Sequence, residues 1–459
     1  MFFRLLIIVL MSCSQVSAGS ETAPARPNII FILCDDLRWN SLGCTGNSLI
    51  KTPNIDQLAK RGTLFNNCFV TTSICAVSRA SILSGQYARR HGIEDFATPF
   101  TREQWKNTYP ALLRNAGYRT GFIGKFGVGN AQAIAAMKAD FDFWRGLPGQ
   151  AGLFINPKDP QKTHATARFG EQALEFLDHL KPEQPFCLSI SFNAPHARDG
   201  QPREFMPDPR DESLYQDTMF PIPELANERA WKKLPDFAQN LEGRKRWQRR
   251  FADPAMFQKT VRDYARLITG IDREIERIVH RLESLKLTNN TIIIFTSDNG
   301  FILGERGMAD KWLMYEESIR VPLIIVDPRL PKQQQQQKDS HLILNIDFAP
   351  TLLTYAGVPV PNTMQGKTLR PLMAGLPTTW RSDFFYEHRT FPKIIPPSEG
   401  VRSENWKYLR WIGATPAVEE LYNLKNDPLE TNNLVGSPSD QKKLNELRKK
   451  WENYSTNLR

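Results

Sequence analysis

Residues 28–36 read NIIFILCDD, and the fold class that the sequence predicts follows first from this stretch. The run from Ile29 to Cys34 is continuously apolar, which is typical of a strand buried on both faces of a parallel sheet. Two aspartates, Asp35 and Asp36, follow it at once. The stretch therefore predicts a buried strand with two carboxylates at its carboxyl end.

Three later stretches have the same form, an apolar run followed by polar side chains. They are residues 119–123 before Gly124 and Lys125, residues 186–192 before Asn193 and His196, and residues 291–297 before Asp298 and Asn299. In an open α/β sheet, ligands bind outside the carboxyl ends of the strands. We therefore expect the polar side chains of all four stretches to meet at one rim.

Helix-spaced apolar residues lie between the predicted strands, at residues 52–62, 108–116, 163–180 and 257–285. This alternation predicts an α/β fold, a large mostly parallel central sheet with helices on both faces. After about residue 374, short Tyr- and Trp-bearing segments such as residues 406–410 predict a small antiparallel sheet, and a charged helix follows over residues 439–451. The predicted organisation is an α/β domain at residues 26–373 and a C-terminal subdomain at residues 374–459.

Two segments have no clear period. Residues 199–253 are rich in Pro, Arg and Trp, and two interpretations stay open: a long excursion over the rim, or a disordered surface loop. Residues 331–338 contain five consecutive glutamines and predict a solvated loop.

Residues 1–18 have the pattern of a cleaved secretory signal, with Arg4, an apolar run at residues 5–10 and small residues at 16–18. We expect export to the periplasm, the cell surface or the medium. Cys13 is also compatible with lipoprotein processing, which would make it a lipid anchor. No later run of about 18 apolar residues occurs, so we expect no transmembrane span.

The chain has 459 residues, of which 41% are hydrophobic and 24% charged, and this balance excludes a disordered polymer. Its formal net charge of +10 favours anionic partners. The basic residues are scattered and export is predicted, so we expect no nucleic-acid partner. Anionic lipid and sulfated or phosphorylated glycans stay open on charge alone.

Five cysteines follow the predicted signal: Cys34, Cys44, Cys68, Cys75 and Cys187. An odd number in an exported protein leaves at least one thiol unpaired or chemically special. The others allow up to two disulfides, although a chain of this size does not depend on disulfides to fold.

Oxygen ligands for a cation are predicted at the rim. Adjacent carboxylates such as Asp35 and Asp36 repel each other unless a cation or basic group lies between them, although one of them could instead cap a helix. With Asp298 and Asn299 they form a hard oxygen-donor set, which suits Ca²⁺ or Mg²⁺ better than Zn²⁺.

Cys75 lies where a loop enters a helix, and Arg79 follows about one turn later. The helix dipole and Arg79 would favour an anion beside this thiol. Taken alone, a small buried cysteine on an apolar helix face explains the position more simply.

Taken together, these motifs resemble those of the type I sulfatases of the alkaline-phosphatase-like superfamily. Residues 75–79, Cys-Ala-Val-Ser-Arg, stand where that family has its Cys-x-Pro/Ala-x-Arg signature. Further matching stretches follow the family's order, at residues 28–36, 53–56, 117–120, 194–196, 297–300, 310–318 and 420–424. The likeness runs from about residue 26 to beyond residue 433, so residues 26–373 are expected to form the catalytic domain.

The resemblance implies a sulfuric ester hydrolase in which a formylglycine-generating enzyme oxidises Cys75 to formylglycine. It implies one divalent cation, Ca²⁺ rather than Mg²⁺, and a set of ligands: Asp35, Asp36, Cys75, Asp298 and Asn299. It also implies that Arg79 anchors the nucleophile, that Lys125 and Lys311 bind sulfate oxygens, and that His196 protonates the leaving alcohol.

A sulfated carbohydrate is the expected substrate, because the sequence shows no hydrophobic anchor for a steroid or lipid sulfate. The segment after His196 and the C-terminal subdomain are expected to shape the sugar pocket. Four side chains could meet carboxylates or neighbouring sulfates of the substrate, or could simply be solvated: His164, Arg198, Arg203 and Arg210.

The chain departs from the family pattern at two positions. Val77 replaces the proline or alanine of the signature, and Gly127 stands where the family usually has the histidine of Gly-Lys-x-His. His91 could supply an imidazole, although packing beneath the nucleophile helix explains it more simply. Two alternatives to a sulfatase stay open: a phosphomonoesterase or phosphonate hydrolase of the same superfamily, and a sulfated-glycan-binding protein with an impaired site.

Overall fold

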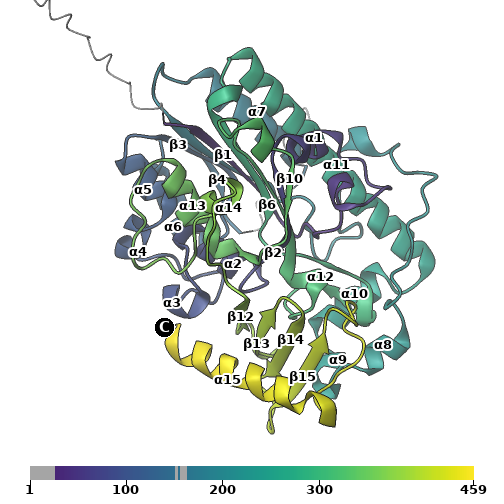
Figure 1. Ribbon diagram of the computed structural model, residues 1–459. Helices are drawn as coiled ribbons and strands as arrows, with labels where there is room; N and C mark the ends of the chain where they lie inside the picture. Colours follow the sequence, from purple (N-terminus) through teal and green to yellow (C-terminus); the bar gives the residue numbers. More distant parts are fainter. Residues whose placement is uncertain (1–25, 150–153, 156–162, 459) are drawn as a thin grey trace, which may run out of the picture.

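The computed structural model describes residues 26–149, 154–155 and 163–458, and a nine-stranded sheet forms its centre (Figure 1). The strand order is β10-β2-β9-β6-β1-β5-β3-β4, with β11 beside β2. The strands are β1 Asn28–Cys34, β2 Thr63–Phe69, β3 Arg119–Lys125, β4 Phe143–Leu147, β5 Phe186–Ser191, β6 Thr291–Ser297, β9 Arg320–Val326, β10 Gln337–Asp339 and β11 Ile343–Leu344. The predicted signal and the Cys13 anchor lie outside the described residues.

Strand β1, the apolar run that precedes Asp35 and Asp36, lies inside this sheet. It pairs in parallel with β5 on one side and with β6 on the other, and all of its residues are buried. In the described part of this sheet, β9 alone runs antiparallel to its neighbours β2 and β6. The prediction of a mostly parallel sheet is therefore confirmed.

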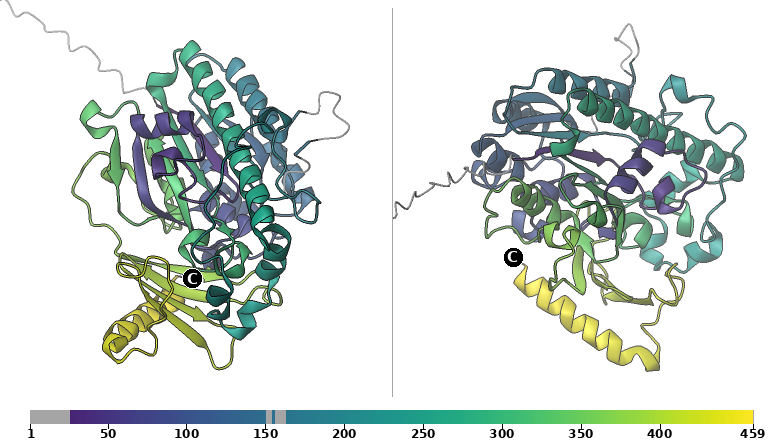
Figure 2. Two further views of the ribbon diagram at one scale, coloured as in Figure 1. Left: turned by 90° about the vertical axis from the view of Figure 1, so that its right-hand side faces the viewer. Right: turned by 45° about the horizontal axis from the view of Figure 1, so that its top comes forward.

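Helices cover both faces of the sheet because the side chains of β1 alternate. Ile29 and Phe31 point into an apolar core with three helices, α2 Cys75–Ser84, α5 Tyr109–Asn115 and α13 Phe348–Tyr355. Ile30 and Ile32 point into a second core with α1 Pro53–Arg61, α7 Ala165–Asp178 and α11 Pro254–Ser284. Figure 2 shows the long helix α11 running along its face of the sheet.

Each predicted helix between the strands is present. Helix α11 begins at Pro254, three residues before the predicted start, because the Asp253 side chain accepts a hydrogen bond from the backbone N–H of Met256 at 2.9 Å. Among the further short helices are α3 Ala88–His91, α4 Arg102–Lys106, α6 Ala131–Ala136, α12 Glu316–Ile319 and α14 Arg370–Met373. None of the described helices is long and apolar enough to cross a membrane.

Both segments of weak periodicity contain regular secondary structure. Residues 199–253 form an excursion with three short helices, α8 Glu228–Lys232, α9 Asp236–Gln239 and α10 Glu242–Arg250, so the disordered loop is wrong. The glutamine run is only partly a loop, since Gln337 begins the edge strand β10, which pairs with β2.

A second, antiparallel sheet of four strands lies below the first in Figure 1, as predicted. Its strands are β12 Asp383–His388, β13 Ser398–Ser403, β14 Trp406–Trp411 and β15 Val418–Asn423. Helix α15, Gln441–Asn457, packs Leu444 and Leu447 against Val401 and Tyr408 of this sheet. A short hairpin of β7 Ile302–Leu303 and β8 Ala309–Asp310 completes the strands of the described ranges.

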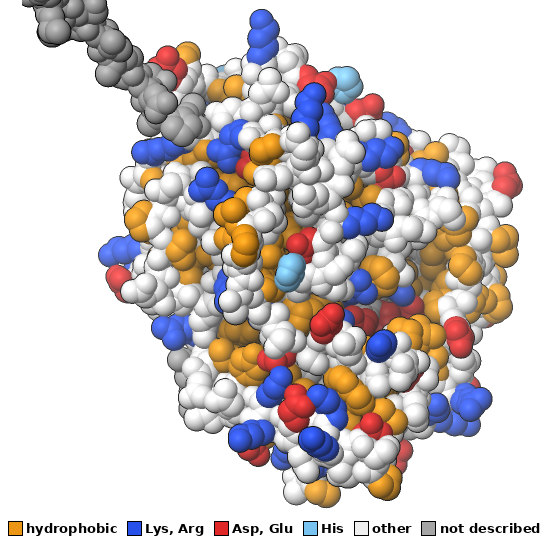
Figure 3. Space-filling view, viewed as in Figure 1, with side chains coloured by type: hydrophobic (Ala, Val, Ile, Leu, Met, Phe, Trp, Pro, Cys, Tyr) orange, Lys and Arg blue, Asp and Glu red, His pale blue; other side chains and the backbone are white. Residues whose placement is uncertain are grey.

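The positive charge is dispersed on the face that Figure 3 shows. Lys and Arg side chains are interspersed there with Asp and Glu, and they form no single continuous basic patch on that face.

Candidate active site

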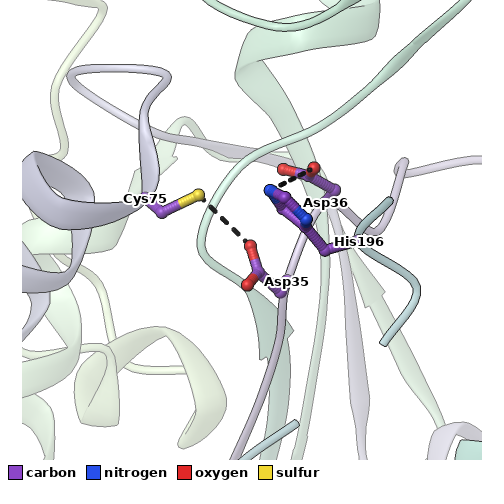
Figure 4. Close-up of side chains that lie close together, drawn as sticks. All are labelled: Asp35, Asp36, Cys75 and His196. Carbon is purple, nitrogen blue, oxygen red and sulfur yellow. Dashed lines mark hydrogen bonds and ion pairs between the residues drawn. The ribbon is translucent and has the colours of Figure 1, made fainter. Parts of the chain in front are cut away.

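The carboxyl ends of the central strands bring the predicted polar side chains together. Asp35 and Asp36 follow β1, His196 follows β5, and Cys75 is the first residue of α2. These four buried residues each offer a ligand atom, and the atoms lie within 4.8 Å of one another (Figure 4). A helix start and two strand ends, far apart in sequence, thus form one compact cluster.

The Cys75 thiol reaches this cluster from the start of α2. Its Sγ is 3.2 Å from Asp35 Oδ1, to which it donates (Figure 4). Burial, reinforced by the charge of Asp35, raises the pKa of the Cys75 thiol well above its ordinary value. All five cysteines after the predicted signal carry free thiols in the described ranges, so neither of the two possible disulfides forms.

Two buried lysines bind the paired aspartates. Lys125 Nζ, at the end of β3, lies 2.5 Å from Asp35 Oδ2, and Lys311 Nζ lies 2.5 Å from Asp36 Oδ1. The Lys125 side chain is fully buried and that of Lys311 is 4% exposed. A buried ammonium requires such a partner, because an unpaired charge in the interior is costly. The two lysines therefore face the cluster.

Arg79 ties helix α2 to the rest of the rim. Its Nε donates to Asp298 Oδ2 at 2.8 Å, and its Nη1 donates to the Lys125 carbonyl at 2.6 Å and to Ser191 Oγ at 2.5 Å. Its Nη2 lies 3.6 Å from Asp35 Oδ2 and has no hydrogen-bond partner among the described residues. One guanidinium thus connects α2, β3, β5 and the segment after β6.

Asp298 and Asn299 adjoin the four-residue cluster through Asp36. Asp298 Oδ1 accepts from the Asp36 backbone N–H at 3.3 Å, and Asn299 Nδ2 donates to Asp36 Oδ1 at 2.5 Å. Asp36 Oδ2 and Asn299 Oδ1 are buried oxygens without a hydrogen-bond partner in the described part of the chain. Such oxygens suit a hard cation, so the donor set fits the divalent ion that the sequence predicts.

The three carboxylates have strongly different environments. Burial would raise the pKa of Asp35, but the combined charges around it, that of Lys125 first among them, outweigh burial and hold this pKa well below its usual value. Burial raises the pKa of Asp36 to about 7, opposed by Lys311 and reinforced by Asp35. Burial and repulsion from Asp35 likewise raise the pKa of Asp298 to about 7.

His196 is held against Asp36. Its Nδ1 contacts the carbonyl oxygen of Ala197, and its Nε2 lies 3.4 Å from Asp36 Oδ2. Burial, followed by the charge of Lys311, lowers the pKa of His196 to about 3. The side chain is therefore a neutral imidazole at neutral pH, with Nδ1 donating to the carbonyl.

Gly127 is packed against Arg79. A Cβ at this position would lie 2.7 Å from Arg79 Cδ and 3.3 Å from its Nε, and the backbone φ is +78°. Any side chain here would meet Arg79, so position 127 holds no room for a histidine. His91 does not replace it, because its Nε2 lies 3.1 Å from Ser81 Oγ, against α2 as predicted. Val77 fills a small apolar cluster with Ile74, Trp312 and Ile395.

Three of the four candidates for contacts with the sugar are engaged within the protein. Arg203 pairs with Asp263 and Glu212, and Arg210 pairs with Asp208. His164 caps α7, and its Nε2 lies 2.9 Å from the Met206 carbonyl oxygen. Arg198, the fourth candidate, is half-buried.

The structure adds four residues near the site to which the sequence assigned no role. Asp199 and Asp310 lie in the segments that carry His196 and Lys311, and both bind arginines of α10, Arg246 and Arg250. The sequence signal was the spacing of the two arginines, which puts them on one face of a helix.

Comparisons with known proteins agree over most of the chain. Residues 27–358 match the sulfatase family, and residues 304–457 match the C-terminal region of N-sulphoglucosamine sulphohydrolase. An N-acetylglucosamine-6-O-sulfatase of Bacteroides thetaiotaomicron is 31% identical over 96% of this chain and 88% of its own.

Solved structures have the same fold. A protein solved in complex with its substrate D-glucosamine-2-N,6-O-disulfate is 30% identical, with a TM-score of 0.80 over 94% of this chain and 98% of that one. A phosphonate monoester hydrolase of Agrobacterium radiobacter is 22% identical, with a TM-score of 0.76 over 93% of this chain and 96% of that one, and this likeness shows the fold alone. The chain belongs to the sulfatase family of the alkaline-phosphatase-like superfamily, and it is a sulfuric ester hydrolase.

Proposed function

We propose that the protein hydrolyses the sulfate ester of a sulfated sugar of the 6-O-sulfated glucosamine class, through a formylglycine made from Cys75 and a bound Ca²⁺. The observation that carries the proposal is the position of Cys75 at the start of α2, beside Asp35 and Asp36 with their two buried lysines. The two relatives near 30% identity support the sugar class, because one is named for a 6-O-sulfated glucosamine and the other was solved with one.

The charges of the site support an anionic substrate. Three carboxylates, those of Asp35, Asp36 and Asp298, face three cationic side chains, those of Lys125, Lys311 and Arg79. These charges balance, so a divalent cation held by the oxygens of Asp35, Asp36, Asp298 and Asn299 would leave the site positive and complementary to a sulfate ester. When bound, the cation and the formylglycine would supply a hydroxyl nucleophile of lowered pKa and neutralise sulfate oxygens.

The chain's own residues would do the remaining work. Lys125 and Lys311 would bind sulfate oxygens and offset the charge that develops as the bond from sulfur to the sugar oxygen breaks. Arg79 would anchor the nucleophilic side chain at position 75. His196, protonated on Nε2, would donate its proton to the leaving sugar alkoxide, which is a poor leaving group. An anionic sulfate beside the ring favours the imidazolium form that this step needs.

The test combines chemical analysis with turnover. The protein is produced with a formylglycine-generating enzyme, the Cys75 peptide is analysed by mass spectrometry, and sulfate release from N-acetylglucosamine-6-sulfate is measured with Ca²⁺. We expect formylglycine at position 75, sulfate release by the wild type and none by Cys75→Ala. Cys187→Ala, which truncates another buried free thiol, is the matched control and should remain active.

Two results would favour the alternatives. Phosphate release that exceeds sulfate release on matched aryl esters would indicate a phosphomonoesterase or phosphonate hydrolase. Retained glycan binding with equal, negligible turnover by the wild type and Cys75→Ala would indicate a glycan-binding protein with an impaired site.

We further propose that the protein is exported, with residues 1–18 removed or, in the lipoprotein alternative, with Cys13 lipidated. The support is the order of basic, apolar and small residues in this segment. The N-terminus of the protein recovered from the producing cells decides between the two, and an intact Met1 in a cytoplasmic fraction would refute both.

A further inference from the structure

Helix α10 carries two arginines that bind the same two aspartates. Arg246 Nη1 lies 2.6 Å from Asp310 Oδ2 and 3.0 Å from Asp199 Oδ2. Arg250 Nη1 lies 2.7 Å from Asp310 Oδ2, and its Nη2 lies 2.5 Å from Asp199 Oδ1. The arginines are four residues apart, so both project from one face of the helix. The four side chains form a closed ring of ion pairs, which we call the α10 ring.

The two aspartates of the α10 ring belong to the segments that carry two site residues. Asp199 follows His196 by three residues, and Asp310 directly precedes Lys311. The backbone on both sides of Lys311 is left-handed, with φ of +84° at Asp310 and +82° at Trp312. Non-glycine residues hold this conformation only where the surroundings impose it. The α10 ring is the contact that fixes Asp310 from the side of α10.

Burial makes the Asp310 side of the α10 ring a rigid connection. The side chains of Arg250 and Asp310 are 1% and 2% exposed, so each needs its charged partners in place. Arg250 Nε also donates to Glu204 Oε2 at 2.5 Å, which ties α10 to the segment after His196 a second time. The guanidinium of Arg246 lies 5.1 Å from the ring centre of Trp312, next to Lys311.

We propose that α10 is a positioning element, in which Arg246 and Arg250 hold Asp199 and Asp310 together and thereby set His196 and Lys311 relative to Cys75. The inference rests on the proposed function for what His196 and Lys311 do. The four members of the α10 ring are positioning residues, because they act through the segments that they connect. Asp310 Oδ1 lies 3.6 Å from Lys311 Nζ, and Lys311 in turn reaches Asp36.

The two arms of the α10 ring should have different kinetic signatures. The Asp199 arm holds the proton donor, which matters for a sugar alkoxide but little for 4-nitrophenolate, a good leaving group. The Asp310 arm holds a sulfate-binding lysine, which matters for every sulfate ester and for inorganic sulfate. A residue that serves only folding would affect both esters alike.

The experiment compares Asp199→Ala and Asp310→Asn with Asp178→Ala, which removes a surface ion pair with Arg281 at similar exposure to Asp199. We expect Asp199→Ala to lower kcat on N-acetylglucosamine-6-sulfate by about 10- to 100-fold, and on 4-nitrophenyl sulfate by less than about threefold. We expect Asp310→Asn to lower kcat/KM on both esters by about 10- to 100-fold, and to weaken inorganic sulfate binding, measured by calorimetry, about tenfold. The Asp178→Ala control should match the wild type in all three.

An equal effect of Asp199→Ala on both esters, or none beyond the control, would overturn the proposal. Should Asp310→Asn not fold, Arg246→Met opens the α10 ring from the helix side and must lower turnover of both esters. A wild type that hydrolyses neither ester would refute the proposed function instead. In that case the affinity for inorganic sulfate still tests the Asp310 arm. Unchanged affinity in Asp310→Asn would overturn the role of this arm, and tenfold weaker binding would support it.

Discussion

Replacing Gly127 by alanine tests the packing that excludes a side chain beside Arg79. The added Cβ would lie 2.7 Å from Arg79 Cδ, whereas carbon atoms in contact are about 3.5–4.0 Å apart. Arg79 must therefore retreat by about 1 Å, and its 2.8 Å bond to Asp298 and 2.6 Å bond to the Lys125 carbonyl cannot both survive.

The expected cost has two parts. A non-glycine residue in the left-handed region costs about 1–2 kcal/mol, and Gly127 has φ of +78°. Crowding in a packed interior adds about 1–3 kcal/mol. Together the two terms lower the free energy of unfolding of Gly127→Ala by about 2–5 kcal/mol. A shift of 1 Å in a positioned catalytic group lowers turnover by about 100-fold.

The assay measures kcat/KM for N-acetylglucosamine-6-sulfate and the free energy of unfolding in urea. Gly117→Ala is the matched control, because Gly117 has φ of +89° but no atom within 4 Å of an added Cβ. Gly117→Ala should lose only the about 1–2 kcal/mol that a left-handed backbone costs a non-glycine residue, and it should keep its activity. If Gly127→Ala were as active and as stable as Gly117→Ala, the packing argument would be wrong.

Three further predictions concern charge and metal. Lys311→Met leaves Asp36 buried without its ammonium, so it should cost about 3–5 kcal/mol of stability and lower kcat/KM by about 100- to 1000-fold; Lys106→Met, on the surface, should do neither. EDTA should stop sulfate release, and Ca²⁺ should restore it better than Mg²⁺, because Ca²⁺ accepts the larger and less regular oxygen set; activity that survives EDTA would contradict the metal assignment. Burial raises the pKa of Asp272 from 3.8 to about 6, so the folded state binds its proton more tightly, and stability relative to Asp272→Asn should fall as pH rises through this range. Thermal denaturation from pH 4 to 7 measures the stability difference between the wild type and Asp272→Asn. A difference that does not change with pH would refute the predicted fall.

The core of the α/β domain could be predicted because its signals are local. The apolar run before Asp35 and Asp36 forms a strand that pairs in parallel with β5 and β6. Side chains that follow such parallel strands meet at one rim of the sheet. The approach of Asp298 and His196 to Asp36 follows from this rule alone. The start of a helix at Cys75 could also be predicted from its neighbours, whereas strand β2, which precedes it, was not predicted.

Helix α10 and its contacts could not be predicted in the same way. The helix is short and rich in arginine, so it lacks the apolar period that identifies a packed helix. Its arginines are held by Asp199 and Asp310, which lie 51 and 60 residues away for Arg250. Contacts over such separations depend on how whole segments fold back on each other.

Periodicity and the order of the strands, which neighbouring residues encode, were enough to predict a mostly parallel sheet, a rim of carboxylates with Lys125 and His196, and a small antiparallel sheet. Cys75 and Lys311 were assigned to that rim through the resemblance to the sulfatases. The tertiary structure alone decided that Gly127 packs against Arg79, that Arg203 and Arg210 are engaged within the protein, and that α10 binds the segments of His196 and Lys311. Burial and ion pairing decide these matters, and both are properties of residues brought together from distant parts of the chain.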